Sequence, residues 1–190
     1  MKEKTLVLLK PDAVQRGLIG EIITRFEKVG LKIVASKLIS ASEELADEHY
    51  QFDDSWFESV GSKFRESLSE KGISREESDI ELGKEFKKFL TSYLSMSPVF
   101  AMVLEGHGVI KLVRKLVGPT NPADAPPGTI RGDYTIDSYK LSGFSNRSLQ
   151  NLIHASENKV DAEREINLWF EESDILEWKR VDEDLIYRGL

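Results

Sequence analysis

The sequence predicts an α+β fold built on a four-stranded antiparallel sheet, with helices packed on one face of that sheet. Short apolar segments alternate with longer amphipathic ones, in the order strand, helix, strand, short helices, strand, helix, strand. This order is typical of a split βαβ sheet of the ferredoxin-like kind. The chain has 190 residues, 40% hydrophobic and 31% charged, which is enough to bury a core, and we expect a single domain over residues 1–190.

The first predicted strand and helix lie close to the N-terminus. Residues 5–9 form a short apolar run, which suits a strand that is buried on both faces. Five apolar residues then recur at the spacing of one helix face: Ile19, Ile22, Ile23, Phe26 and Val29. Gly30 stands where such a helix is expected to end.

A second strand and a short helix follow. Residues 31–39 partly alternate between apolar and polar side chains, which predicts the strand. Ser40, with Glu43 three residues later, forms a capping box for a short helix through Tyr50. Residues 52–85 are dominated by charged residues and serine, and we interpret them as an extra surface helix followed by a loop.

The third strand lies between two further helices. A helical pattern begins at Phe86 and is closed by Pro98, directly before an apolar strand over 99–104. Residues 108–117 repeat the helical pattern, and Gly118 is expected to stop that helix.

The last third of the chain starts with a proline-rich segment. Residues 118–128 hold four of the six prolines, so this segment is expected to be a rigid loop, and long ordered loops usually serve function. We expect the last strand over 129–136 and a polar loop over 137–150. A helix over 159–170 follows the capping residue Asn158.

Composition excludes several classes of protein. The 26 Lys and Arg residues against 33 Asp and Glu give a net charge of −7, so binding to nucleic acid is not expected. The chain has no cysteine, which removes disulfides, zinc ribbons and thiol nucleophiles. It has no apolar stretch of about 18 residues and no secretory signal. We therefore expect a cytoplasmic protein without a membrane partner.

The usual phosphate-binding and hydrolase motifs are absent, namely G-x-x-x-x-G-K-[ST], G-x-G-x-x-G and G-x-S-x-G. Of the three histidines, His154 ends an apolar stretch just before a predicted helix, where anions are attracted. An imidazole there could attack phosphorus. The alternative is a buried histidine satisfied by hydrogen bonds. His49 and His107 are interpreted as surface residues.

Three basic residues are candidates for binding an anion. Lys10 ends a wholly apolar strand, so its ammonium reaches either solvent or a ligand. Arg114 and Arg131 flank the proline-rich loop and could clamp phosphate, although surface salt bridges are the alternative.

Taken together, three blocks of sequence closely resemble nucleoside diphosphate kinases. They are residues 5–14 (TLVLLKPDAV), 118–124 with 127–133 (GPTNPAD and PGTIRGD), and 151–156 (NLIHAS). The match covers about residues 4–51, 86–136 and 151–190. It leaves two stretches that look like insertions, one within 52–85 and one within 137–150.

The resemblance implies a ping-pong transfer of the γ-phosphoryl group of a nucleoside triphosphate, typically ATP, to a histidine and then to a nucleoside diphosphate. His154 matches the histidine that is phosphorylated. By the same resemblance, Glu165 orients the ring and Ser156 bonds that carboxylate, while Tyr50 and Lys10 face the transferred group. Positioning and charge neutralisation are most of the catalysis of phosphoryl transfer.

The resemblance also implies a nucleotide site. The matching residues are Lys10, Phe86, Leu90, Arg114, Thr120, Arg131 and Asn151. Of these, Phe86 would stack on the base, with Leu90 on the same helix face. Counting forward from Tyr50 instead of back from Pro98, Trp56 or Phe57 competes for the stacking role. Stacking accepts any base.

Magnesium and self-association are implied as well. Mg²⁺ would sit between phosphate oxygens, so no metal-ligating residue is assigned to the chain. The resemblance implies a homo-oligomer, with a hexamer favoured over a tetramer.

One departure from the family follows the matched histidine. The family usually continues Gly/Ala-Ser-Asp-Ser, whereas Glu157 and Asn158 stand here after Ser156. Glu157 keeps the negative charge with one more methylene, and Asn158 remains a good helix cap. We expect this change to alter the rate rather than the chemistry.

Overall fold

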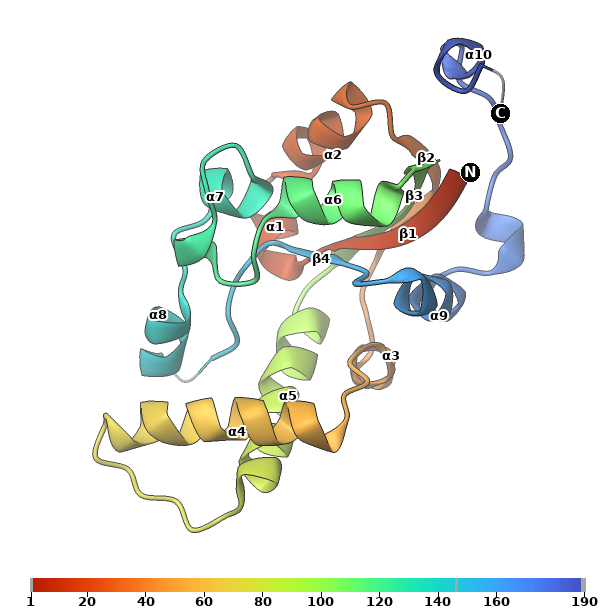
Figure 1. The fold of residues 1–190 in the computed structure, drawn as a ribbon. Helices are drawn as coiled ribbons and strands as arrows, with labels where there is room; N and C mark the ends of the chain where they lie inside the picture. The colour runs from red at the N-terminus through yellow and green to blue at the C-terminus, as the bar shows by residue number, and fades with distance from the viewer. Residues whose placement is uncertain (1, 146, 189–190) are drawn as a thin grey trace.

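The computed structural model describes residues 2–145 and 147–188 and is organised around one four-stranded antiparallel sheet (Figure 1). The strands are β1 (Lys2–Leu9), β2 (Lys32–Ile39), β3 (Val99–His107) and β4 (Ile153–Ala155). They lie in the order β2-β3-β1-β4, and each neighbouring pair is antiparallel. The predicted class of sheet is confirmed.

Helices connect and cover the strands. They are α1 (Pro11–Gln15), α2 (Ile19–Lys28), α3 (Glu43–His49), α4 (Asp54–Ser69), α5 (Asp79–Ser95), α6 (Val109–Val117), α7 (Ile130–Tyr134), α8 (Tyr139–Phe144), α9 (Lys159–Trp169) and α10 (Glu183–Ile186), with 3-10 turns η1 (Pro122–Asp124) and η2 (Glu172–Asp174). Over the described ranges, no helix combines the length and apolar character needed to cross a membrane.

Both faces of the sheet are covered, so the prediction of helices on one face is wrong. Along β1, Leu6 and Leu8 point into a core shared with α3, α5 and α9. Val7 and Leu9 point the other way, into a core shared with α2 and α6. The cause is the unbroken apolar run of β1, which leaves neither face of the strand suited to water.

The predicted strand over 129–136 is a second error. The structure has helix α7 there, because the Thr129 hydroxyl caps its start by accepting a hydrogen bond from the Gly132 N–H at 3.1 Å. The fourth strand is instead β4, whose three residues pair with Val7–Leu9 of β1. The segment that carries His154 is therefore part of the sheet.

Three element boundaries also differ from the prediction. The short helix α3 is capped by Ser42 rather than Ser40. Helix α5 begins at Asp79, before Phe86, behind a capping box formed by Ser78 and Glu81. The expected loop over 137–150 contains α8. In each case a serine supplies the cap: Ser42 for α3, Ser78 for α5 and Ser138 for α8.

The first predicted insertion, within 52–85, contains helix α4 and the start of α5, and the two helices project from the sheet as a pair (Figure 1). Phe64, Leu68 and Leu82 form a small core between them. The two backbones are in contact at two glycines. A Cβ atom at Gly61 would lie 1.7 Å from the Asp79 carbonyl oxygen, and one at Gly83 would lie 2.1 Å from that of Phe57.

Replacing Val7 with alanine tests the two-sided core. Val7 is fully buried on the central strand, so we expect Val7→Ala to lower the free energy of unfolding by about 2 kcal/mol. Val160→Ala is the matched control, because Val160 is 75% exposed on α9. Urea denaturation measures both, and equal losses in the two variants would contradict the assigned core.

Candidate active site

The site is built where the carboxyl end of β1 meets β4 (Figure 1). Lys10 directly follows β1, and His154 lies in the middle of β4, paired with Leu8. The Lys10 N–H donates to the Leu152 carbonyl oxygen at 2.8 Å, which continues the pairing by one residue. Residues from opposite ends of the chain are thereby brought together.

His154 forms a hydrogen-bonded pair with Glu165 of α9. Its Nε2 lies 2.9 Å from Glu165 Oε2, and the Ser156 hydroxyl donates to the same oxygen at 2.7 Å. Burial tends to raise the pKa of Glu165, but His154, Ser156 and Arg164 outweigh it and hold that pKa below its usual value. With the carboxylate ionised, the proton of a neutral His154 ring is on Nε2. The lone pair of Nδ1 is then free for nucleophilic attack.

Tyr50 closes α3 beside this pair. Its side chain is buried, and its hydroxyl has no hydrogen-bond partner among the described residues. Burial, with a smaller contribution from Glu165, raises the pKa of Tyr50. The phenol therefore stays neutral and can donate one hydrogen bond.

Lys10 is linked to the proline-rich loop through Asn151. Lys10 Nζ donates to Asn151 Oδ1 at 2.9 Å, and Asn151 Nδ2 donates to the Thr120 carbonyl oxygen at 2.9 Å. Burial and the nearby charge of Arg131 lower the pKa of Lys10 to about 8, against the opposing effect of Asp12. The ammonium is charged at neutral pH but loses its proton far more readily than an exposed lysine.

The two arginines differ in their surroundings. The buried Arg131 guanidinium donates to the carbonyl oxygens of Gly118 (2.8 Å), Asn151 (3.2 Å) and Ile153 (2.7 Å). Three of its five N–H groups hold the backbone, and two are left for a ligand. Arg114 is exposed and lies 3.9 Å from a Glu157 oxygen.

The backbone just before His154 is strained. Leu152 has a φ of 68°, a left-handed conformation that leucine rarely adopts. Its N–H donates to Asp12 Oδ2 at 3.1 Å, and its carbonyl oxygen accepts from Lys10. The strained residue is therefore held on both sides by α1 and the end of β1.

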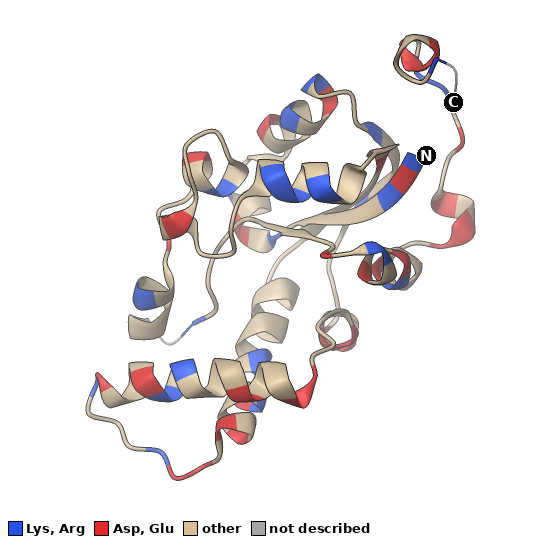
Figure 2. Ribbon diagram, viewed as in Figure 1, with Lys and Arg blue, Asp and Glu red and all other residues tan. Residues whose placement is uncertain are grey.

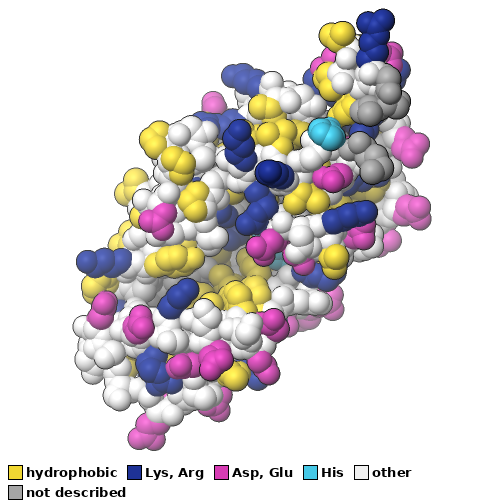
Figure 3. All heavy atoms as spheres, in the orientation of Figure 1, with side chains coloured by type: hydrophobic (Ala, Val, Ile, Leu, Met, Phe, Trp, Pro, Cys, Tyr) yellow, Lys and Arg dark blue, Asp and Glu magenta, His cyan; other side chains and the backbone are white. Residues whose placement is uncertain are grey.

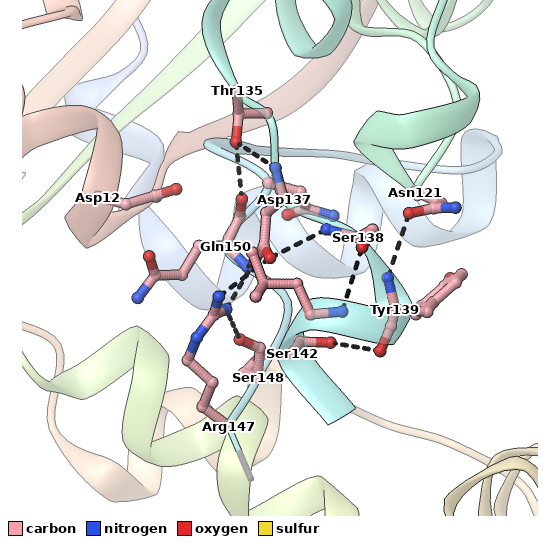
Figure 4. A network of polar contacts seen from close by, with 12 residues as sticks. Asp12, Asn121, Thr135, Asp137, Ser138, Tyr139, Ser142, Arg147, Ser148 and Gln150 are labelled. Atoms are coloured by element: carbon pink, nitrogen blue, oxygen red, sulfur yellow. Dashed lines mark hydrogen bonds and ion pairs between the residues drawn. The ribbon is translucent and has the colours of Figure 1, made fainter. Parts of the chain in front are cut away.

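A buried carboxylate anchors the segment that leads into Asn151 (Figure 4). Asp137 accepts hydrogen bonds from two Arg147 nitrogens at 2.6 and 3.0 Å, and from the backbone N–H groups of Ser138 and Gln150 at 2.9 and 2.7 Å. These contacts, together with the guanidinium of Arg147, keep the pKa of Asp137 low although burial acts in the opposite direction. The second predicted insertion is thus an ordered support for the site.

The aromatic candidates for base stacking lie on the α4–α5 pair. Phe86 is half-buried and packs edge-to-face against Phe64 and Phe89. Leu90, one turn further along α5, packs against the core that contains Tyr50. Trp56 stacks on Phe52, with ring centroids 3.5 Å apart. Phe57 lies edge-on to both of these rings.

One face of the molecule carries a hollow between these helices and α6 (Figure 3). Helix α6 has three basic residues and no acidic one, and it leads into the proline-rich loop (Figure 2). Arg114 and Thr120 are exposed at this end. Helix α6 therefore carries positive charge on a chain that is acidic overall.

Sequence reasoning missed several supporting residues. His49, interpreted as a surface residue, is only 2% exposed. The sequence did contain a signal for its burial, because His49 lies three residues after Ala46 and therefore on the buried face of α3. Asp12 and Asp137 received no role, since the backbone groups that they bind lie on distant or irregular segments.

The whole chain is similar to known enzymes. A family model described as "Nucleoside diphosphate kinase" matches residues 3–70 and 76–175. A nucleoside diphosphate kinase of Pyrobaculum aerophilum is 49% identical, covering 92% of this chain and 98% of that protein. A crystal structure of an NDP kinase from Pyrobaculum aerophilum has a TM-score of 0.86 at 48% identity, covering 93% and 100% of the two chains.

A second similar structure was solved with ligands bound. It is described as a transition-state mimic of the nucleoside-diphosphate kinase from Borrelia burgdorferi with bound vanadate and ADP. Its TM-score is 0.79 at 42% identity, over 97% of this chain and 96% of that one. The fold and site, with these matches, define an enzyme that transfers phosphoryl groups. The chain belongs to the nucleoside diphosphate kinase family.

The lowered pKa of Lys10 predicts a pH dependence of nucleotide binding. Only the protonated ammonium attracts the γ-phosphate, so affinity for a non-hydrolysable analogue of ATP should fall by up to about tenfold for each pH unit above the Lys10 pKa of about 8. Calorimetric titration at a series of pH values measures this affinity. Lys10→Arg should remove this fall, because arginine keeps its proton, and a wild-type affinity that stays constant well above pH 8 would contradict the assignment.

Proposed function

We propose that His154 carries the phosphoryl group between the two nucleotides of the reaction. The observation that supports this most strongly is the bond from His154 Nε2 to Glu165, which Ser156 also holds. In the first half-reaction, Nδ1 attacks the γ-phosphorus, and a new N–P bond forms as the bond from phosphorus to the diphosphate oxygen breaks. In the second, an oxygen of another nucleoside diphosphate attacks and the N–P bond breaks. The Nε2 proton stays with the carboxylate pair throughout.

The surrounding residues supply charge and orientation. Lys10 and Tyr50 would face the transferred group, since both are buried near His49, whose ring packs against that of His154, and both carry donor hydrogens. Arg114, Thr120 and the free N–H groups of Arg131 would bind the phosphates. Asn151 and Lys10 would bind the sugar hydroxyls. Donors fixed before the substrate arrives stabilise the developing charge with little reorganisation.

We propose that Mg²⁺ enters with the nucleotide and is held by phosphate oxygens. Among the residues that the structure describes, the one cluster with metal-ligand spacing is His49, His154 and Glu165. It offers two ring nitrogens and a single carboxylate, whereas Mg²⁺ prefers oxygen ligands. A bound Mg²⁺ would neutralise phosphate charge. The chain needs no dedicated cage for it.

We propose Phe86 as the residue that stacks on the base, with Leu90 beside it. Their positions one turn apart on α5, the helix that also packs near Tyr50, support the proposal. Trp56 and Phe57 on α4 are the competing candidates. We also propose that residues 1–190 form a single kinase domain with insertions within 52–85 and 137–150, and that the first of these borders the nucleotide.

We further propose a cytoplasmic enzyme that assembles as a homo-oligomer, a hexamer in preference to a tetramer. The absence of cysteine suits a reducing compartment. Large apolar side chains are exposed near the C-terminus, and such groups often mark an interface: Leu176, Trp178, Val181, Leu185 and Ile186.

Substitution of the stacking residue tests the nucleotide site. Phe86→Ala should lower the affinity for ADP and for CDP alike by on the order of tenfold, because stacking does not depend on the identity of the base. Equilibrium binding measures both ligands. Trp56→Ala and Phe57→Ala serve as comparisons, and a loss of affinity in either of these with none in Phe86→Ala would reassign the stacking role.

Labelling tests the phosphoryl carrier. Incubation with ATP labelled in its γ-phosphate should mark the wild-type chain at His154, and added nucleoside diphosphate should remove the label as triphosphate. His154→Ala should take up no label and form no triphosphate, because the nucleophile is gone. His107→Ala, at an exposed histidine on β3, is the matched control. Label on any other side chain would refute the proposal.

A further inference from the structure

A second imidazole lies against the ring of His154. The centroids of the His49 and His154 rings are 4.3 Å apart, and their planes are inclined at 83°. One nitrogen of each ring and one Glu165 carboxylate oxygen lie within 4.8 Å of one another. His49 is buried and takes no part in the proposed transfer of the phosphoryl group.

The hydrogen bond from Trp169 defines the tautomer of His49. The Trp169 indole N–H donates to His49 Nδ1 at 3.3 Å, so Nδ1 carries the lone pair and the proton of the neutral ring is on Nε2. Nε2 is a buried donor with no hydrogen-bond partner in the described part of the chain. Coordination of a metal through Nε2 would require this proton to leave and the Trp169 bond to break. The three residues therefore do not form a metal site.

The charges around His49 keep it neutral. Lys10 at the end of β1 and Arg164 on α9 face it as cations, His154 on β4 and Glu165 on α9 lie beside it, and Tyr50 is its neighbour in sequence. Burial, and then the charges of His154, Lys10 and Arg164, hold the pKa of His49 well below its usual value. Its hydrogen-bonding character therefore does not change over the pH range in which His154 reacts.

We propose that His49 is a positioning residue for His154, with its Nε2–H fixed by Trp169 and directed at the pair formed by His154 and Glu165. Edge-to-face packing opposes rotation of the His154 ring, which would exchange its nitrogen and carbon positions. The N–H dipole favours the ionised carboxylate, which in turn keeps the His154 proton on Nε2. The inference rests on the proposed role of His154 as phosphoryl carrier.

Two variants and a spectroscopic measurement test it. His49→Phe keeps a ring but removes the donor, and His49→Gln keeps an N–H near the position of Nε2. Long-range ¹H–¹⁵N correlation spectra report the tautomer of His154 without any nucleotide. We expect one Nε2–H tautomer in the wild type and in His49→Gln, and a mixture in His49→Phe. The rate of His154 phosphorylation should fall on the order of tenfold in His49→Phe only.

The pH profile separates positioning from packing. In His49→Phe, the ionised Glu165 loses a favourable dipole, so the acid limb of the phosphorylation rate should move to higher pH. An unchanged tautomer and an unchanged acid limb, even with a lower melting temperature, would overturn the proposal and make His49 a packing residue.

If His49→Phe does not fold, Trp169→Phe provides the test, because it releases His49 Nδ1. We expect mixed tautomers at His49 and the same shift of the acid limb, and retention of both wild-type properties would overturn the proposal. Failure of the proposed function would instead be seen as absence of label at His154 in the wild type.

Discussion

The site depends on the pairing that fixes the short strand β4 against the carboxyl end of β1. Three residues cannot form a long ladder, so the position of β4 also depends on groups that bind the backbone of residues 151–153. Asp12 and Lys10 fix both sides of Leu152, and Arg131 binds the carbonyl oxygens on either side of it. With β4 fixed, the distance between His154 and Glu165 is set by the packing of α9 on β1, rather than by a flexible loop.

Local patterns predicted those elements whose signal lies within the element. The apolar run of β1 predicted a strand, and the cap at Asn158 predicted α9 at its observed start. The prediction failed where competing local signals were close in strength. Residues 129–136 contain strand-favouring threonine, isoleucine and tyrosine, but one hydroxyl at Thr129 caps a helix. The three residues of β4 are too few to show a period, so only the pairing with β1 makes them a strand.

The site residues were predicted from the resemblance to nucleoside diphosphate kinases, because local sequence patterns do not show which distant residues lie close together. His154 and Lys10 each had an ordinary structural interpretation in sequence, and their common surroundings come from the antiparallel pairing of distant segments. The residues that hold the site in place were harder to predict. Asp137 is one of many acidic residues in the chain, and nothing local shows that four donors converge on it. Its role follows from the irregular path of the backbone around it.

The glycine contacts of the α4–α5 pair determine how that part of the molecule can respond to a ligand. Where main chain touches main chain, no side chain is present that could change rotamer and let the helices slide, so the two move together or not at all. The pair therefore presents a surface of fixed shape to the neighbouring hollow.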